Sequence, residues 1–172
     1  MRRPATRPKQ GATLSKQHLG STHVAQIAVV VHDIEESARR YAEIFGLAVP
    51  RIITTEPGAS AAMTYRGQQS NAQAKLAFFD MGQVQIELIQ PLGGASVWQE
   101  ALDSRGEHVQ HIAFWVEGMQ RSADFLKAQG VPMVQRGDMM EGKGQYAYFD
   151  SQNSLGVTLE LLESEMEARA EY

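Results

Sequence analysis

The amino-acid sequence predicts an α+β fold made of two similar modules, each with the element order β-α-β-β-β. Two strand-like stretches are imperfect copies of each other, and each is followed by apolar residues at helical spacing. Two later strand-like stretches are also repeated. The matching stretches are 24–31 with 109–116, 77–80 with 147–150, and 84–89 with 157–162. Because a duplicated element order is typical of a repeated structural unit, we expect two closely packed half-domains.

The elements of the first half follow from local signals. Residues 24–31 form a continuous, β-branched run that is typical of a buried strand. Asp33 is a suitable helix N-cap with Glu36 three positions later, and Gly46 ends the helical spacing. Further strands are expected at 47–53, 75–79 and 83–89, with turns at Pro57-Gly58 and Met81-Gly82.

The second half repeats this order after a short linking helix. That helix is expected at 96–105, with Ser96 as its cap. The expected elements that follow are a strand at 109–116, a helix at 119–129 ending at Gly130, and strands at 131–136, 145–149 and 156–162. The acidic stretch 163–171 is expected to be a surface helix.

These elements divide the chain into four parts. Residues 1–20 carry five basic residues and no acidic one, and we expect a flexible arm, although an organellar transit peptide has a similar composition. Residues 21–94 form the first module, and residues 95–163 form the linking helix and the second module. Residues 164–172 are assigned to an acidic C-terminal helix or tail.

Composition excludes several classes of function. Five of the 16 Lys and Arg residues lie in the first 20 positions, which leaves 11 against 20 acidic residues and argues against nucleic acid as a partner. The absence of cysteine excludes disulfides and thiolate chemistry and favours a cytoplasmic location. No apolar run is long enough to cross a bilayer, so no membrane partner is expected.

Strand parity places four polar residues on one surface. If Val29 and Val31 pack beneath the following helix, Gln26 faces the other way. The same counting puts one polar side chain from each of three other strands on that surface. These residues are Glu87, His111 and Glu160, with Gln85, Ile89, Ala113, Trp115, Thr158 and Leu162 beside them on the same face. Because polar groups in apolar strands are costly to bury without a partner, the surface is expected to be a ligand-binding cup.

At these residues the sequence resembles the vicinal oxygen chelate superfamily, which includes glyoxalases, bleomycin-resistance proteins and extradiol dioxygenases. The resemblance covers nearly all of residues 23–163. It rests on the segments 26–29, 32–34, 86–92, 111–114 and 159–161. It implies paired βαβββ modules that form a cup-shaped mixed β-sheet with flanking helices, and one metal ion held by Gln26, Glu87, His111 and Glu160.

The donor types are consistent with this implication. One imidazole, two carboxylates and one amide oxygen form a neutral complex with a divalent ion, which lowers the cost of burial. Such a set suits Zn, Ni, Co, Mn or Mg. Taken singly, Glu87 or Glu160 can be a solvated strand residue, and His111 can be a core histidine. Trp115, Gln85 and Thr158 are expected to contact a small-molecule substrate, whereas Phe78, Phe79, Tyr148 and Phe149 are expected to be chiefly core.

The resemblance implies an isomerase or lyase that enolises a carbonyl or acyl-thioester substrate. A metal ion stabilises negative charge on two substrate oxygens, and a carboxylate moves a proton at the α-carbon. Glu160 is the first candidate for this base and Glu87 the second. A metal-free binding protein of the antibiotic-resistance type is the alternative from a different class, and a homodimer is possible.

Resemblance within the superfamily divides between two enzymes. Segments 82–92 and 109–113 are most similar to methylmalonyl-CoA epimerases, which have His at the position of Gln26 and a proposed catalytic Glu near the position of Lys75. The ligand set Gln, Glu, His, Glu is instead that of animal-type glyoxalase I. Its glutathione-binding Arg and Asn are replaced here by Val30 and Pro91. Extradiol dioxygenases have His in place of Gln26, and oxygen chemistry is the least favoured enzymatic interpretation.

Overall fold

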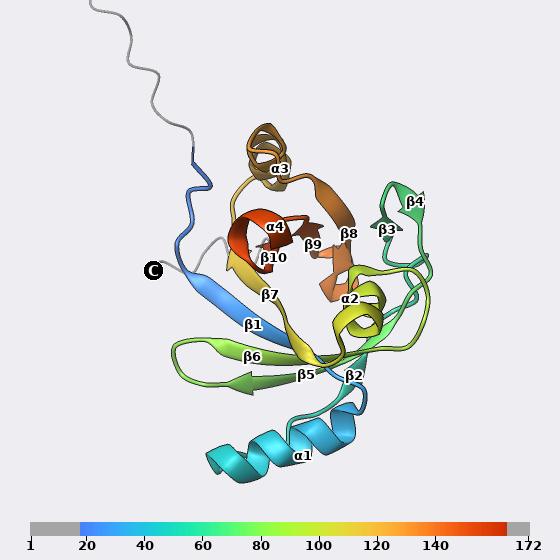
Figure 1. Ribbon diagram of the computed structural model, residues 1–172, viewed down its shortest axis with the longest axis vertical. Coiled ribbons are helices and arrows are strands. Elements are labelled where there is room, and N and C mark those ends of the chain that lie inside the picture. Colours follow the sequence, from blue (N-terminus) through green and yellow to red (C-terminus); the bar gives the residue numbers. More distant parts are fainter. Residues whose placement is uncertain (1–17, 165–172) are drawn as a thin grey trace, which may run out of the picture.

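The computed structural model describes residues 18–164, and within that range ten strands form one continuous mixed sheet (Figure 1). The strands of the first half are β1 (Val24–Val30), β2 (Ile53–Thr54), β3 (Thr64–Tyr65), β4 (Gln68–Gln69), β5 (Ala74–Asp80) and β6 (Gln85–Pro91). Those of the second half are β7 (His108–Trp115), β8 (Met133–Met139), β9 (Gly144–Phe149) and β10 (Thr158–Ser164). The helices are α1 (Ile34–Phe45), α2 (Val97–Arg105), α3 (Met119–Ala128) and α4 (Gln152–Leu155), with a 3₁₀ turn η1 (Met140–Gly142).

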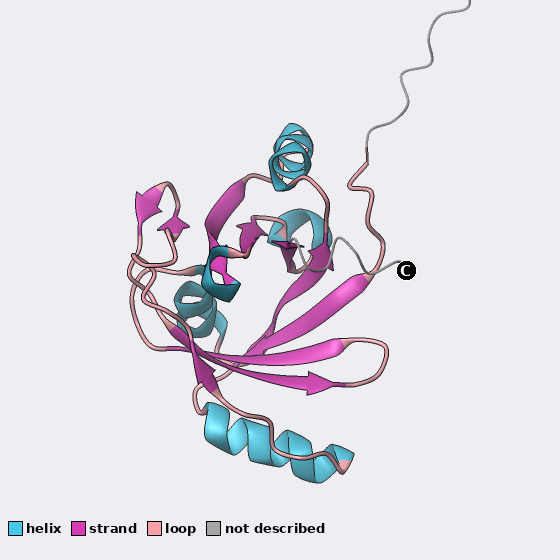
Figure 2. Cartoon of the chain, turned by 180° about the vertical axis from the view of Figure 1, so that it is seen from behind, coloured by secondary structure: helices cyan, strands magenta, loops and turns pink. Residues whose placement is uncertain are grey.

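The strand order confirms the predicted α+β cup of paired modules. It runs β2-β5-β6-β1-β7-β10-β9-β8-β3-β4, so each half contributes the same spatial sequence of four strands. The first strands of the two halves, β1 and β7, pair antiparallel at the centre, and each is flanked by the parallel last strand of its own half. The sheet curls around this centre, as the two opposite views show (Figures 1 and 2). The last strands of both halves therefore lie next to the central pair.

The predicted helix ends are confirmed where a cap specifies them. Asp33 accepts a hydrogen bond from the Glu36 amide at 2.8 Å, and Gly46 has the positive φ of 67° that suits glycine. Ser96 accepts a hydrogen bond from the Gln99 amide at 3.1 Å and caps α2 as expected.

Two predicted elements are wrong in extent. The strand expected at 47–53 is reduced to β2, which pairs only with Leu76 and Lys75 at the sheet edge. Pro50 has no amide hydrogen for a ladder there. At the other end, β10 continues to Ser164, so the first residues of the expected acidic helix are strand, while 165–172 and most of the arm lie outside the described residues.

The β3–β4 hairpin was not predicted. It comes from the first half, but β3 pairs with β8 of the second half, and Thr64 lies opposite Arg136. Each of its strands is two residues long, which is too short for an alternating pattern to be seen in the sequence.

Side chains alternate between an outer layer under the helices and the inner face of the curled sheet. On β5, Ala77 and Phe79 pack under α1, whereas on β9, Ala147 and Phe149 pack with α3. The intervening residues of the same strands point inward. Helix α2 covers part of the inner region, where Trp98 packs with buried residues of both halves. Along residues 18–164 no helix is long and apolar enough to cross a membrane.

The outer layer of α1 gives a matched test of this packing. Ile34 is completely buried at the start of α1, whereas Ile44 on the same helix is 60% exposed. We expect Ile34→Ala to lower the free energy of unfolding by about 2–5 kcal/mol. Ile44→Ala should change it by less than about 1 kcal/mol. Urea unfolding followed by circular dichroism measures both, and equal effects would contradict this assignment of the helix face.

Candidate functional site

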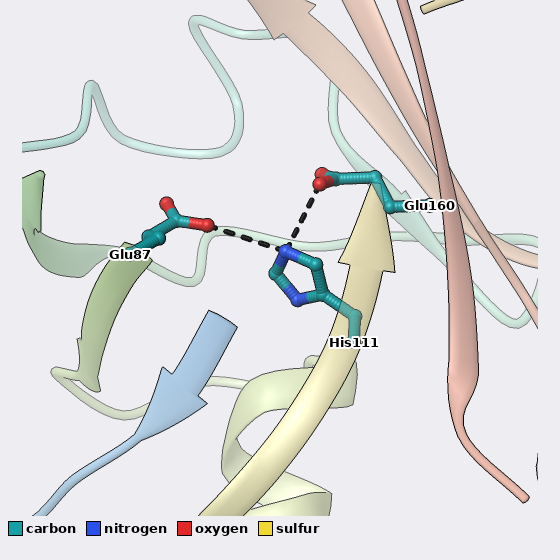
Figure 3. A group of neighbouring side chains, drawn as sticks. All are labelled: Glu87, His111 and Glu160. Carbon is teal, nitrogen blue, oxygen red and sulfur yellow. Dashed lines mark ion pairs between the residues drawn. The ribbon is translucent and has the colours of Figure 1, made fainter. Parts of the chain in front are cut away.

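Three of the four predicted polar anchors meet at one point on the inner face of the sheet. Glu87 comes from β6, His111 from β7 and Glu160 from β10, and all three are buried. The Nε2 atom of His111 lies 3.0 Å from Oε2 of Glu160 and 3.2 Å from Oε2 of Glu87 (Figure 3). Their donor atoms all lie within 4.8 Å of one another.

Small residues in the central strands leave room for this group. Ala28 of β1 lies in register between Glu87 on one side and His111 on the other. Ala113 of β7 lies beside Glu160 in the same way. Both alanines are completely buried. A larger side chain at either position would occupy the space into which the carboxylates and the imidazole project.

A β-bulge orients the imidazole. Val29 pairs with Val109 and Ala28 with His111, so Gln110 is an extra residue on β7. The Gln110 side chain is buried, and its Oε1 lies 2.6 Å from Nδ1 of His111. Because an amide oxygen only accepts, Nδ1 carries the hydrogen. In the neutral ring, Nε2 therefore has no hydrogen, and its lone pair faces two carboxylates.

The electrostatics of this group require a positive charge among the three side chains. Burial alone lowers the pKa of His111, but the charges and contacts of Glu160 and Glu87 outweigh burial and raise that pKa to about 10. Burial also raises the pKa of Glu87, against the lowering effect of His111. The two carboxylates are therefore held together either by a proton on Nε2 or by a cation that takes its place.

The geometry and the unsatisfied atoms fit a metal ion. Ligand atoms about 2.1 Å from one ion and at right angles are separated by about 3.0 Å. The two contacts of Nε2, at 3.0 and 3.2 Å, match that separation. Among the described residues, neither Nε2 of His111 nor Oε2 of Glu160 has a partner with hydrogen-bond geometry, although both are buried. Such unsatisfied atoms are what a coordinated ion would complete.

Gln26, the fourth predicted ligand, lies at the edge of this group. Its Nε2 donates a hydrogen bond of 2.7 Å to Oε1 of Gln85, the residue opposite it on β6. Its own amide oxygen is not used in that bond. Both amides line the cavity above the three buried residues, so the structure brings Gln26 and Gln85 to the same cavity.

The cavity has a volume of about 640 Å³ and extends from the buried group toward solvent. Of the residues expected to contact substrate, Trp115 and Gln85 line it, whereas Thr158 does not. The expectation that the paired aromatics are chiefly core holds for three of the four. Phe79, Tyr148 and Phe149 are buried in the core, and Tyr148 also lines the cavity, as does the half-buried Phe78.

Tyr148 is the aromatic residue nearest the buried group. Its ring packs edge-on against the His111 imidazole, with 5.0 Å between the centroids. Burial, followed by the nearby carboxylates, raises its pKa well above the usual value, so the phenol is neutral. The equivalent residue in the first half is Phe78, which has no hydroxyl group. This difference between the repeats could have indicated from the sequence that Tyr148 lies near a polar site.

Lys75 does not reach the cavity. It lies on the outer face of β5, and its Nζ contacts Oε1 of Glu35 on α1 at 2.6 Å. The residues of β5 that line the cavity are Leu76 and Phe78, which are both apolar. Strand β5 therefore supplies no acid to this site.

Several residues at the cavity could not be located from the sequence. Gln110 became a partner of His111 only through the bulge, which breaks the parity rule. Glu56 and Glu141 line the cavity from segments between strands, and Asp138 lies on β8 just beyond the strand predicted at 131–136. No repeat or motif marks these carboxylates.

A curled sheet of paired modules with a buried His–Glu–Glu group defines a class of cup-shaped proteins able to hold a metal ion beneath a ligand cavity. The family is shown directly. The model of the Glyoxalase/Bleomycin resistance protein/Dioxygenase superfamily matches residues 25–149, and the chain belongs to that superfamily. The chain is also 26% identical over 147 residues to the uncharacterized protein YqjC of Bacillus subtilis, covering 85% of this chain and 95% of that protein.

Solved structures share the fold at lower identity. Methylmalonyl-CoA epimerase from Mycobacterium tuberculosis is 21% identical with a TM-score of 0.61, covering 88% of this chain and 93% of its own. A hypothetical protein from Bacillus halodurans is 22% identical with a TM-score of 0.60, covering 83% and 94%. A methylmalonyl-CoA epimerase in complex with methylmalonyl-CoA and NH₄⁺ is 19% identical with a TM-score of 0.60, covering 84% and 96%.

Removal of the imidazole tests the electrostatic balance of the site. Because His111→Leu leaves two buried carboxylates without a positive partner, we expect it to lower the free energy of unfolding by about 3–5 kcal/mol in metal-free protein. Adding Glu87→Gln and Glu160→Gln to this variant removes the repulsion and should recover at least about 2 kcal/mol. Urea unfolding at neutral pH measures both. If the triple variant were no more stable than His111→Leu, repulsion between the Glu87 and Glu160 carboxylates would not explain the loss of stability.

Proposed function

We propose that this protein is a divalent-metal-dependent isomerase or lyase that enolises a carbonyl or acyl-thioester substrate by proton transfer at the α-carbon. The observation that carries the proposal is the convergence of Glu87, His111 and Glu160 below the cavity. Within the superfamily to which the chain belongs, that arrangement supports catalysis better than simple binding. A binding cavity alone does not require two buried carboxylates.

The metal would be held by Glu87, His111 and Glu160, with Gln26 able to supply an amide oxygen. The donor set suits Zn, Ni, Co, Mn or Mg. When bound, such an ion supplies Lewis-acid stabilisation of negative charge that develops on the substrate oxygens.

The proton is moved by a carboxylate of the same group. Glu160 lines the cavity and is only 3% exposed. In the proposed step, the α-carbon gives its proton to the Glu160 carboxylate oxygen that is not a metal ligand, and the electron pair of the C–H bond becomes that of the enolate. Glu160 then returns the proton, to the same carbon or to its neighbour. Glu87 is the second candidate for this role.

The surroundings of Glu160 suit proton transfer. Leu162, Ile89 and Phe78 line the cavity beside the carboxylates and exclude water from the reacting carbon. The Gln26–Gln85 amide pair offers hydrogen bonds that orient the oxygen atoms of a substrate. Proton loss to water is thereby limited while the enolate exists.

The two enzymes suggested by resemblance are supported unequally. The epimerases of known structure share the fold, but β5 of this protein presents Leu76 to the cavity, so a single carboxylate group would have to remove and return the proton. The glutathione-binding positions of glyoxalase I are Val30 and Pro91, which are both buried. Glutathione is therefore not favoured as the thiol.

Binding without catalysis is the second candidate function. A specific observation favours it: the cavity is large enough for a drug-sized molecule and is lined mainly by apolar and aromatic residues. In that case the buried group would hold a proton in place of a metal ion.

Metal content distinguishes the two candidates. After reconstitution with each divalent ion and desalting, we expect about one equivalent of metal per chain by mass spectrometry. Because Gln110 fixes the imidazole, Gln110→Leu should weaken metal binding by about 10–100-fold. Gln120→Leu, on the exposed surface of α3, is the matched control. Less than about half an equivalent with every ion would favour the binding protein.

Solvent deuterium exchange tests the catalytic step. With metal present, we expect exchange at the α-carbon of methylmalonyl-CoA, of the methylglyoxal hemithioacetal or of a related carbonyl compound. Glu160→Gln should slow it by at least about 100-fold, because the proton acceptor is lost. Glu117→Gln, an exposed change outside the cavity, should leave it unchanged. Unchanged exchange in Glu160→Gln would exclude Glu160 as the base for that substrate.

A further inference from the structure

The charged residues that line the cavity are all acidic. Five carboxylates contribute to its wall, and no Lys, Arg or His of the described chain lines it. The five are Glu56, Glu87, Asp138, Glu141 and Glu160. From the described part of the chain, a ligand therefore meets acidic but no basic side chains at the cavity wall.

These carboxylates lie at two depths. Glu87 and Glu160 are buried, whereas Glu56, Asp138 and Glu141 are exposed and mark where the cavity opens. Each of the three exposed residues comes from a different segment. They lie after β2, on β8 and in η1, and the hydrogen bond from the Asp138 amide to the Ala61 carbonyl joins the first two regions at 2.7 Å.

Two basic residues from the same region of the fold are paired away from the cavity. Lys75 is paired with Glu35 on the outer face, and Arg66 is paired with Glu100 at 3.0 Å. Protonated His111 or a divalent ion in the buried group balances charge on Glu87 and Glu160, so the acidic character at the opening comes from the other three carboxylates. Oε2 of Glu160 is buried 3.0 Å from Nε2 of His111 and has no partner with hydrogen-bond geometry among the residues described.

The remaining lining suits an apolar body. Trp98, Trp115 and Tyr146 line the cavity, together with Phe78 and Tyr148. Aromatic rings attract organic cations as well as apolar groups. Anionic ligands would be repelled by the negative field and would meet no basic side chain at the cavity wall.

We propose that the substrate of this protein is a small organic cation, with an apolar or aromatic body inside the cavity and its positive group at the opening among Glu56, Asp138 and Glu141. The reaction of this substrate rests on the proposed function, whereas the preference for binding a cation rests on the cavity lining alone. This preference predicts that conjugates of coenzyme A and glutathione, which have a net negative charge, bind less tightly than conjugates of a cationic thiol.

The tryptophan fluorescence of the protein reports cavity binding directly. The chain has two tryptophans, Trp98 and Trp115, and both line the cavity. We expect benzyltrimethylammonium to quench this fluorescence with a Kd at least about tenfold lower than that of phenylacetate at low salt. Benzyl alcohol should bind with intermediate affinity. The difference between the two ions should shrink at about 0.5 M salt, because screening weakens the field.

Neutral variants at the opening identify the residues responsible. The triple variant Glu56→Gln, Asp138→Asn and Glu141→Gln should reduce the preference for the cation at least about fivefold. A control with the same change in net charge is Glu43→Gln, Glu117→Gln and Asp150→Asn, all exposed and outside the cavity. Phenylacetate binding as tightly as the cation, or equal effects of the two triple variants, would overturn the inference.

A series of hemithioacetals separates this inference from the proposed reaction. Methylglyoxal is combined with thiocholine, 2-mercaptoethanol or 3-mercaptopropionate, so that the thiol is cationic, neutral or anionic. We expect kcat/KM for deuterium exchange to fall in that order. Exchange that is fastest for the 3-mercaptopropionate adduct would overturn the charge inference and leave the reaction standing. No exchange for any adduct, with the fluorescence preference intact, would count against the reaction on these carbonyls and support the charge inference.

Discussion

The contact of one imidazole with two carboxylates in the interior is the constraint around which this fold is arranged. Ionised Glu87 and Glu160 are stable at such depth only because a positive charge, from a proton on His111 or from a metal ion, lies between them. The three residues belong to strands that are far apart in the chain, and the curled sheet brings those strands together. The alanines between them and the Gln110 bulge are adaptations to the same requirement.

Much of this arrangement could be predicted from the sequence because it depends on local periodicity. The two-residue period of a strand assigns Glu87, His111 and Glu160 to one face without knowledge of the tertiary structure. The duplication then indicates that these faces meet. Caps at Asp33 and Ser96 are similarly local, since each needs only a side chain and an amide three residues later.

The features that could not be predicted arise from departures from local periodicity or from contacts made by loops. The bulge at Gln110 adds one residue to β7, and no residue type at that position signals it. The segment 47–53 contains the apolar residues of a strand, but only Ile53 belongs to β2. Strand β2 lies at the sheet edge and pairs with β5 alone, and Pro50 has no amide hydrogen to extend that pairing. Glu56 is far in the chain from Asp138 and Glu141, so the cavity wall that the three residues share is a property of the tertiary structure.

The β3–β4 hairpin has a consequence for how the chain folds. Although the duplication suggests two units that can form separately, the hairpin of the first half completes the sheet edge of the second, with Thr64 opposite Arg136. Such a pairing between distant segments closes a long loop and slows folding. During synthesis the hairpin has no sheet partner until β8 has been made. The two halves are therefore joined by strand pairing at the sheet edge as well as at the centre, and neither half is a complete folding unit without the other.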